Sequence, residues 1–133
     1  MSKKQYKADY KPCMMLSSSD KHFAMVYEQM FKSEAFRKLP IGAREFYIAC
    51  RIQANTTDGR ACLMRHGNEY GISYNIETEF VFPEKHLESF GYKRGNAYKL
   101  FRQLEQAGFI TINERNKPLK RVNVYAFSDK WKS

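Results

Sequence analysis

The sequence predicts one α+β domain, mainly α-helical, in which several helices are followed by a β-hairpin. Its length of 133 residues suits a single compact domain with its own core. Apolar residues recur at helical spacing through much of the chain. Two β-prone segments, FITINE and VNVYAFS, follow one another late in the chain. Together these three observations favour helices first and a hairpin last.

The first part of the chain differs from the rest in composition. Residues 1–20 end in SSSD, contain little that could pack, and carry Lys3, Lys4, Lys7 and Lys11. We therefore expect a flexible basic tail there and a folded domain over residues 21–133. A solubilising terminus is the simpler interpretation of the tail, and an arm that binds phosphate is the alternative.

Two helices are expected to open the folded domain. Apolar residues at helical intervals predict the first over residues 23–39, and Pro40 begins a second, central helix that runs to about Asn55. Residues 56–78 hold three glycines and show no sustained period. We expect a long loop or a small hairpin in that segment.

Short elements follow in the second half. Residues 79–83 read as a brief strand stopped by proline, and residues 84–90 as a two-turn helix that ends at Gly91. A longer helix over residues 95–107 ends at Gly108. The hairpin comes last, with a basic tip, RNKPLKR, between its two strands.

The helix over residues 95–107 has two unlike faces. Apolar side chains on one arc predict a packed face, and polar and basic side chains lie opposite. We expect Phe101 and Leu104 in the core, together with Ile110, Ile112 and Val124 from the hairpin. Trp131 is expected to pack the end of the segment back onto the domain.

The segment FGYKRGNAYKLFRQLEQAGFITI, followed by the basic loop and VNVYAFSDKWK, resembles winged helix-turn-helix domains of small bacterial and phage DNA-binding proteins. The segment FAMVYEQMFKSEAFRKLPIGAREFYIACRI is similar to the amino-terminal domain of plasmid and phage replication initiators. The resemblance implies a three-helix core, a C-terminal hairpin wing and an extra N-terminal helix.

The same resemblance implies which residues meet DNA, through a helix in the major groove and a wing on the backbone or minor groove. The net charge of the chain is +9, and residues 84–133 hold eleven basic and five acidic residues. Such side chains neutralise phosphates or bond base edges. The implied residues are Lys93, Arg94, Asn96, Tyr98, Lys99, Arg102 and Gln103 on the helix, and Arg115, Lys117, Lys120 and Arg121 on the wing.

The roles of two of these positions have alternative interpretations. Lys93 stands where this family usually has a capping Ser or Thr, so Asn96 is expected to cap a later start of the helix. Tyr98 is placed either to stack on sugar or base, or to border the core.

The expected function is sequence-specific binding of double-stranded DNA, as a transcriptional regulator or replication-initiation protein of a bacterium, plasmid or prophage. A winged-helix module that docks an acidic protein partner is the alternative, and binding of single-stranded nucleic acid through exposed tyrosines is a third. The sequence leaves monomer and dimer equally open.

Other classes of function find little support. No nucleophile has a paired base and no glycine-rich phosphate loop occurs, so we expect no enzyme. No metal site or cofactor is expected, because the three histidines are scattered and no two cysteines have ligand spacing. Without an apolar run of membrane length, a cytoplasmic protein with reduced thiols is expected.

Overall fold

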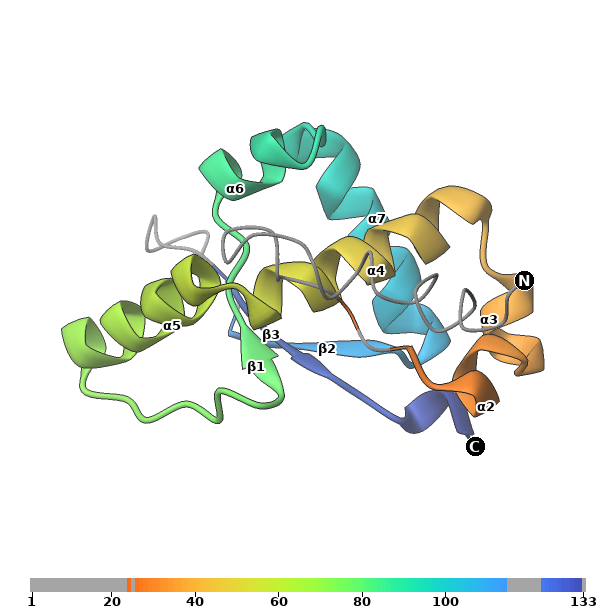
Figure 1. Cartoon of the computed structure of the whole chain (residues 1–133), viewed down its shortest axis with the longest axis horizontal. Coiled ribbons are helices and arrows are strands. Elements are labelled where there is room, and N and C mark those ends of the chain that lie inside the picture. The colour runs from red at the N-terminus through yellow and green to blue at the C-terminus, as the bar shows by residue number, and fades with distance from the viewer. Residues whose placement is uncertain (1–23, 25, 115–122, 133) are drawn as a thin grey trace, which may run out of the picture.

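A computed structural model describes residue 24, residues 26–114 and residues 123–132 (Figure 1). The predicted tail, residues 1–20, lies outside the described residues. The described chain is an α+β domain, mainly helical, with one small antiparallel sheet. Its elements are α2 (Glu28–Phe31), α3 (Glu34–Lys38), α4 (Ile41–Asn55), α5 (Thr57–Tyr70), β1 (Glu79–Phe80), α6 (Glu84–Ser89), α7 (Arg94–Ala107), β2 (Ile110–Glu114), β3 (Val124–Phe127) and a 3-10 turn at Lys130–Lys132.

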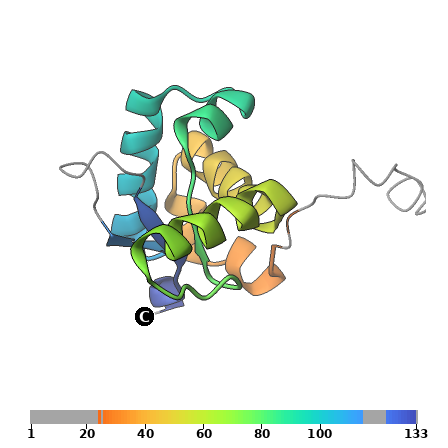
Figure 2. The ribbon, with the colours of Figure 1, turned by 90° about the vertical axis from the view of Figure 1, so that its left-hand side faces the viewer.

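The helices are distributed unevenly around the sheet. Figures 1 and 2 show α4, α6 and α7 grouped on one side of the sheet, with α2 and α3 at one end of the molecule and α5 extending toward the other. None of the helices among the described residues is long and apolar enough to cross a lipid bilayer.

Helix α4 is the central scaffold that the sequence predicts. It follows Pro40, whose fixed φ of −58° suits the entry to a helix. Its inner face buries Phe46 and Tyr47, and the Phe46 ring meets the Phe101 ring edge to face with 4.8 Å between centroids. Tyr47 packs against Phe109 at 5.8 Å. These contacts tie α4 to α7 and to the start of the hairpin.

The prediction of a long loop or small hairpin over residues 56–78 is wrong for most of that segment, which forms α5. Thr56 Oγ1 accepts a 2.8 Å hydrogen bond from the Gly59 amide and so caps the helix. Two glycines that suggest a loop instead permit close packing. A Cβ at Gly59 would lie 2.1 Å from Gln53 O, and one at Gly67 would lie 2.4 Å from Ile72 O. Only residues after the helix end at Tyr70 are irregular.

The single helix predicted over residues 23–39 is also wrong, because the structure has two short helices there. Ser33 accepts a hydrogen bond from the Phe36 amide at 3.1 Å and donates one to Met30 O at 2.6 Å. A serine that caps one helix while bonding the last turn of another ends the first and starts the second. Both helices still bury an apolar residue, Met30 in α2 and Phe36 in α3.

The sheet has the strand order β1-β3-β2, so β3 lies between its neighbours and pairs antiparallel with both. Glu79 of β1 faces Ala126, and Ile110 of β2 faces Phe127. A bulge interrupts the β2–β3 pairing between Ile112 and Glu114. The strand predicted over residues 79–83 forms only at Glu79–Phe80, whereas the predicted pairing of the last two strands is confirmed.

The predicted core is largely confirmed. Phe101, Leu104, Ile110 and Val124 are buried, whereas Ile112 is half-buried and packs against the edge of the core. Trp131 stacks on Phe109 with 5.8 Å between ring centroids and 9° between planes. This stack returns the chain after β3 to the body of the domain, as the sequence predicts.

Candidate nucleic-acid interface

Helices α6 and α7 are joined by a tight turn whose shape depends on one glycine. Gly91 has a φ of +91°, and its amide donates to Glu88 O at 2.9 Å. The Tyr92 amide donates to Leu87 O, also at 2.9 Å. This pair of bonds is a Schellman motif, which closes α6 and redirects the chain into α7.

Tyr92 packs against the inner side of this turn. Its ring meets the Phe46 ring edge to face at 4.8 Å, and its hydroxyl donates to Glu45 Oε1 at 3.4 Å. Burial, with a smaller effect from the Glu45 carboxylate, raises the pKa of Tyr92 to about 12. The phenol therefore stays neutral at physiological pH and keeps donating its hydrogen bond.

Helix α7 has the two faces that the sequence predicts. Ala97, Phe101 and Leu104 are buried against the rest of the domain. The Phe101 ring stacks on Tyr125 of β3 with 3.9 Å between centroids. Figure 2 shows α7 along one side of the molecule, with α6 across its upper end.

The seven predicted residues of this helix region all reach solvent. The structure places them in the turn, in the first turn of α7 and on its outer face, and each side chain is exposed: Lys93, Arg94, Asn96, Tyr98, Lys99, Arg102 and Gln103. Within the described residues, Lys93, Lys99 and Arg102 form no ion pair, while Arg94 lies 3.9 Å from Glu84 at the surface. Exposed pairs at that distance are weak, so all four cations keep most of their charge available.

The start of α7 differs from one prediction. Its N-cap is Lys93, which makes no side-chain capping bond, and Arg94 is already helical. Asn96 therefore lies in the first turn, and the expectation that it caps a later start is wrong. The first bond within the helix is Ala97 N to Lys93 O at 2.9 Å. The amides of Arg94, Gly95 and Asn96 precede it and have no intrahelical acceptor, as at any helix start.

Tyr98 lies on the outer face and is 55% exposed, so it does not border the core. Arg102, one turn later, donates to the Tyr98 hydroxyl at 3.5 Å, and its guanidinium lies 5.9 Å from the centre of the Tyr98 ring. The pair presents an aromatic face and a planar cation side by side. Both groups suit stacking and hydrogen bonding with bases.

The four predicted wing residues, Arg115, Lys117, Lys120 and Arg121, lie outside the described residues. The strands on either side are described, and they pair up to Glu114 and Val124. At the end of β2, Asn113 Nδ2 donates to Glu79 Oε2 at 2.9 Å and links that strand to β1.

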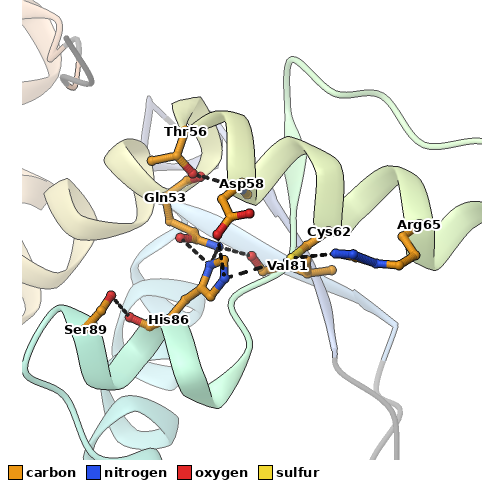
Figure 3. Close-up of polar contacts among 9 residues, drawn as sticks. Gln53, Thr56, Asp58, Cys62, Arg65, Val81, His86 and Ser89 are labelled. Atoms are coloured by element: carbon orange, nitrogen blue, oxygen red, sulfur yellow. Dashed lines mark hydrogen bonds and ion pairs between the residues drawn. The ribbon is translucent and has the colours of Figure 1, made fainter. Parts of the chain in front are cut away.

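The sequence alone does not point to one further group of polar side chains. Figure 3 shows Asp58 and Cys62 of α5 next to His86 of α6, with Gln53 of α4 on the other edge of the imidazole. His86 Nε2 lies 3.5 Å from Asp58 Oδ2 and 4.0 Å from Cys62 Sγ. The spacing of Asp58 and Cys62 would place both on one helical face, but only if the segment is recognised as a helix.

The described residues contain no group of three or more His, Cys, Asp or Glu side chains arranged to hold a metal ion. Comparisons of the chain with protein-family models, with curated proteins and with solved structures find no match.

Proposed function

We propose that this chain binds double-stranded DNA in a sequence-specific way through the outer face of α7. One observation carries the proposal: Lys93, Arg94, Lys99 and Arg102 reach solvent together from one segment whose opposite face is buried. Localised positive charge on an exposed helix is the electrostatic footprint of a phosphate-binding surface. The free amides at the start of α7 add donors of the kind that bind phosphate oxygens.

The arrangement of elements supports a winged helix-turn-helix as the basis of this binding. Helices α4, α6 and α7 pack together, α6 and α7 are joined by a tight turn, and β2 and β3 follow α7 as paired strands. In such a domain α7 enters the major groove, and the basic residues that follow β2 in the sequence contact the backbone or minor groove. The biological role proposed is transcriptional regulation or replication initiation in the cytoplasm of a bacterium or on a plasmid or prophage.

The proposal is tested by fluorescence anisotropy with a labelled random-sequence duplex across a series of salt concentrations. The variant replaces Arg94, Lys99 and Arg102 with alanine. Its matched control replaces three exposed basic residues, Lys32, which follows α2, and Arg37 and Lys38 of α3, and so removes the same charge. If each of the three replaced residues of α7 contacts one phosphate, the slope of log affinity against log salt concentration becomes shallower by about 2.7 in the variant.

The outcomes are distinct. Equal weakening in the two triple variants, or affinity without salt dependence, would overturn the proposal. Preference for a single-stranded oligonucleotide would favour stacking on Tyr98 instead. An acidic protein partner is the second candidate, since the N-cap is Lys93 rather than the Ser or Thr that is usual in winged-helix DNA-binding domains. That candidate gains support if selection from a random pool of duplexes enriches no sequence, while a palindrome would indicate a two-fold dimer.

A further inference from the structure

We propose that Cys62 is a covalent modification site, a nucleophilic thiol that reacts with peroxides and other small electrophiles and uses His86 as its proton acceptor. This site lies outside the surface assigned to DNA and needs no DNA for its chemistry. It is built from three helices, with Cys62 on α5, His86 on α6 and Gln53 on α4 (Figure 3).

Gln53 sets the orientation of the His86 imidazole. Its side chain is buried, and Nε2 donates to Val81 O at 3.0 Å, which anchors the amide. Both ends of the amide lie close to His86 Nδ1, Oε1 at 3.1 Å and Nε2 at 2.8 Å, so the hydrogen bonds admit either tautomer of the imidazole. The reaction draws on the tautomer with its proton on Nδ1, which satisfies the buried Oε1 and leaves a lone pair on Nε2, the nitrogen that lies 4.0 Å from Cys62 Sγ.

Two further groups favour charge separation between sulfur and imidazole. Arg65 Nη2 donates to Cys62 Sγ at 3.4 Å, and this hydrogen bond is the largest of the effects that raise the pKa of Arg65. A guanidinium at that position stabilises a thiolate. Asp58 Oδ2 lies 3.5 Å from His86 Nε2 and stabilises the imidazolium that forms when the proton arrives.

In the reaction with hydrogen peroxide, the thiol proton moves to His86 Nε2, and the thiolate attacks one peroxide oxygen. An S–O bond forms, the O–O bond breaks, and the leaving hydroxide takes the proton from the imidazolium as water. Cys62 is oxidised by two electrons to the sulfenic acid, and the peroxide is reduced by the same two.

Cys50 provides an internal comparison. It is fully buried in the core, and burial raises its pKa well above the ordinary value. Cys62 is half-buried and has a cation and a proton acceptor within reach. On this proposal Cys62 is the reactive thiol of the two, and Cys50 is the unreactive one.

The test is the rate of alkylation of the full chain by iodoacetamide at neutral pH, followed by tryptic digestion and mass spectrometry. The three cysteines fall in separate peptides: residues 8–21, with Cys13, residues 45–51, with Cys50, and residues 61–65, with Cys62. We expect Cys62 to react at least about tenfold faster than Cys50. Peroxide followed by dimedone should label the same peptide.

Arg65→Gln is the decisive variant because Arg65 is exposed, so its loss removes the cation without uncovering the sulfur. We expect slower alkylation of Cys62 in this variant and in His86→Gln, and an unchanged rate in Arg60→Gln, an exposed base on the same helix. Thermal unfolding identifies any variant whose fold has changed. Equal rates at Cys62 and Cys50, or a rate at Cys62 that is indifferent to Arg65→Gln, would overturn the proposal.

Discussion

Gly91 offers the sharpest test of the turn between α6 and α7. It has a φ of +91°, and a Cβ added there would meet nothing within 4 Å. Replacement by alanine therefore costs only the left-handed backbone conformation, about 1–2 kcal/mol. Alanine also reduces the freedom of the unfolded chain, which offsets about 0.4–1 kcal/mol. The net loss of unfolding free energy is then about 1 kcal/mol.

Gly108 is the informative comparison. It has the same left-handed backbone conformation as Gly91, but it lacks the open space around an added Cβ. Its φ is +88°, and an added Cβ would lie 2.7 Å from the Trp131 amide nitrogen and 3.0 Å from the Lys130 carbonyl carbon. Both neighbours are backbone atoms, so the chain after β3 must move. Such overpacking adds about 1–3 kcal/mol to the conformational cost. Gly108→Ala should therefore lose about 2–4 kcal/mol.

Thermal unfolding followed by circular dichroism measures both losses. At this size 1 kcal/mol lowers Tm by about 4 °C, so we expect a fall of about 4 °C for Gly91→Ala and at least about 8 °C for Gly108→Ala. Gly95→Ala is the control, since Gly95 is exposed, helical and open to a Cβ. It should leave Tm unchanged or raise it. A Gly91→Ala variant as stable as Gly95→Ala, or less stable than Gly108→Ala, would refute the reasoning.

Three other changes have defined outcomes. Phe101→Ala removes a buried ring that stacks on Tyr125, so urea unfolding should show a loss of about 3–5 kcal/mol, whereas the exposed Arg102→Ala should stay within about 0.5 kcal/mol. Gln53→Ala should cost about 1–3 kcal/mol by the same measurement, because Val81 O and His86 Nδ1 lose a buried partner. Tyr92 binds its proton more tightly in the folded state, so its contribution is complete below pH 10 and is lost as pH rises toward 12. Between those pH values the Tm of Tyr92→Phe should therefore fall less than the Tm of the unaltered chain. Plots of Tm against pH that run parallel for the two proteins would contradict this.

The elements around α7 follow from the sequence because two signals coincide there. Apolar residues at helical spacing mark the buried faces of α4 and α7, and Pro40, Gly91 and Gly108 mark boundaries that the backbone dihedrals explain. The exposed side chains of α7 could be predicted for the same reason. Once Phe101 and Leu104 are assigned to the core, the residues opposite must face outward.

Helix α5 could not be predicted in the same way. Its period is hidden by polar residues, since only Gly59, Leu63, His66 and Gly67 are buried. Two of those four are glycines whose role, close approach to another backbone, depends on tertiary structure. The Cys62–His86 contact joins residues 24 positions apart on two helices. It could not be predicted from the sequence unless α5 was recognised as a helix. Likewise, only the hydrogen bonds of Ser33 reveal the break between α2 and α3.

The place of β3 between β1 and β2 has a consequence for synthesis on the ribosome. Glu79–Phe80 and Ile110–Glu114 both emerge before Val124–Phe127, the strand to which each is paired. Phe80 and Ile110 are both buried in the finished domain. Until β3 appears, the strands that carry them lack the backbone hydrogen bonds that hold them in place. The nascent chain must therefore carry two unpaired edges, and sheet assembly becomes a single late event rather than a stepwise addition.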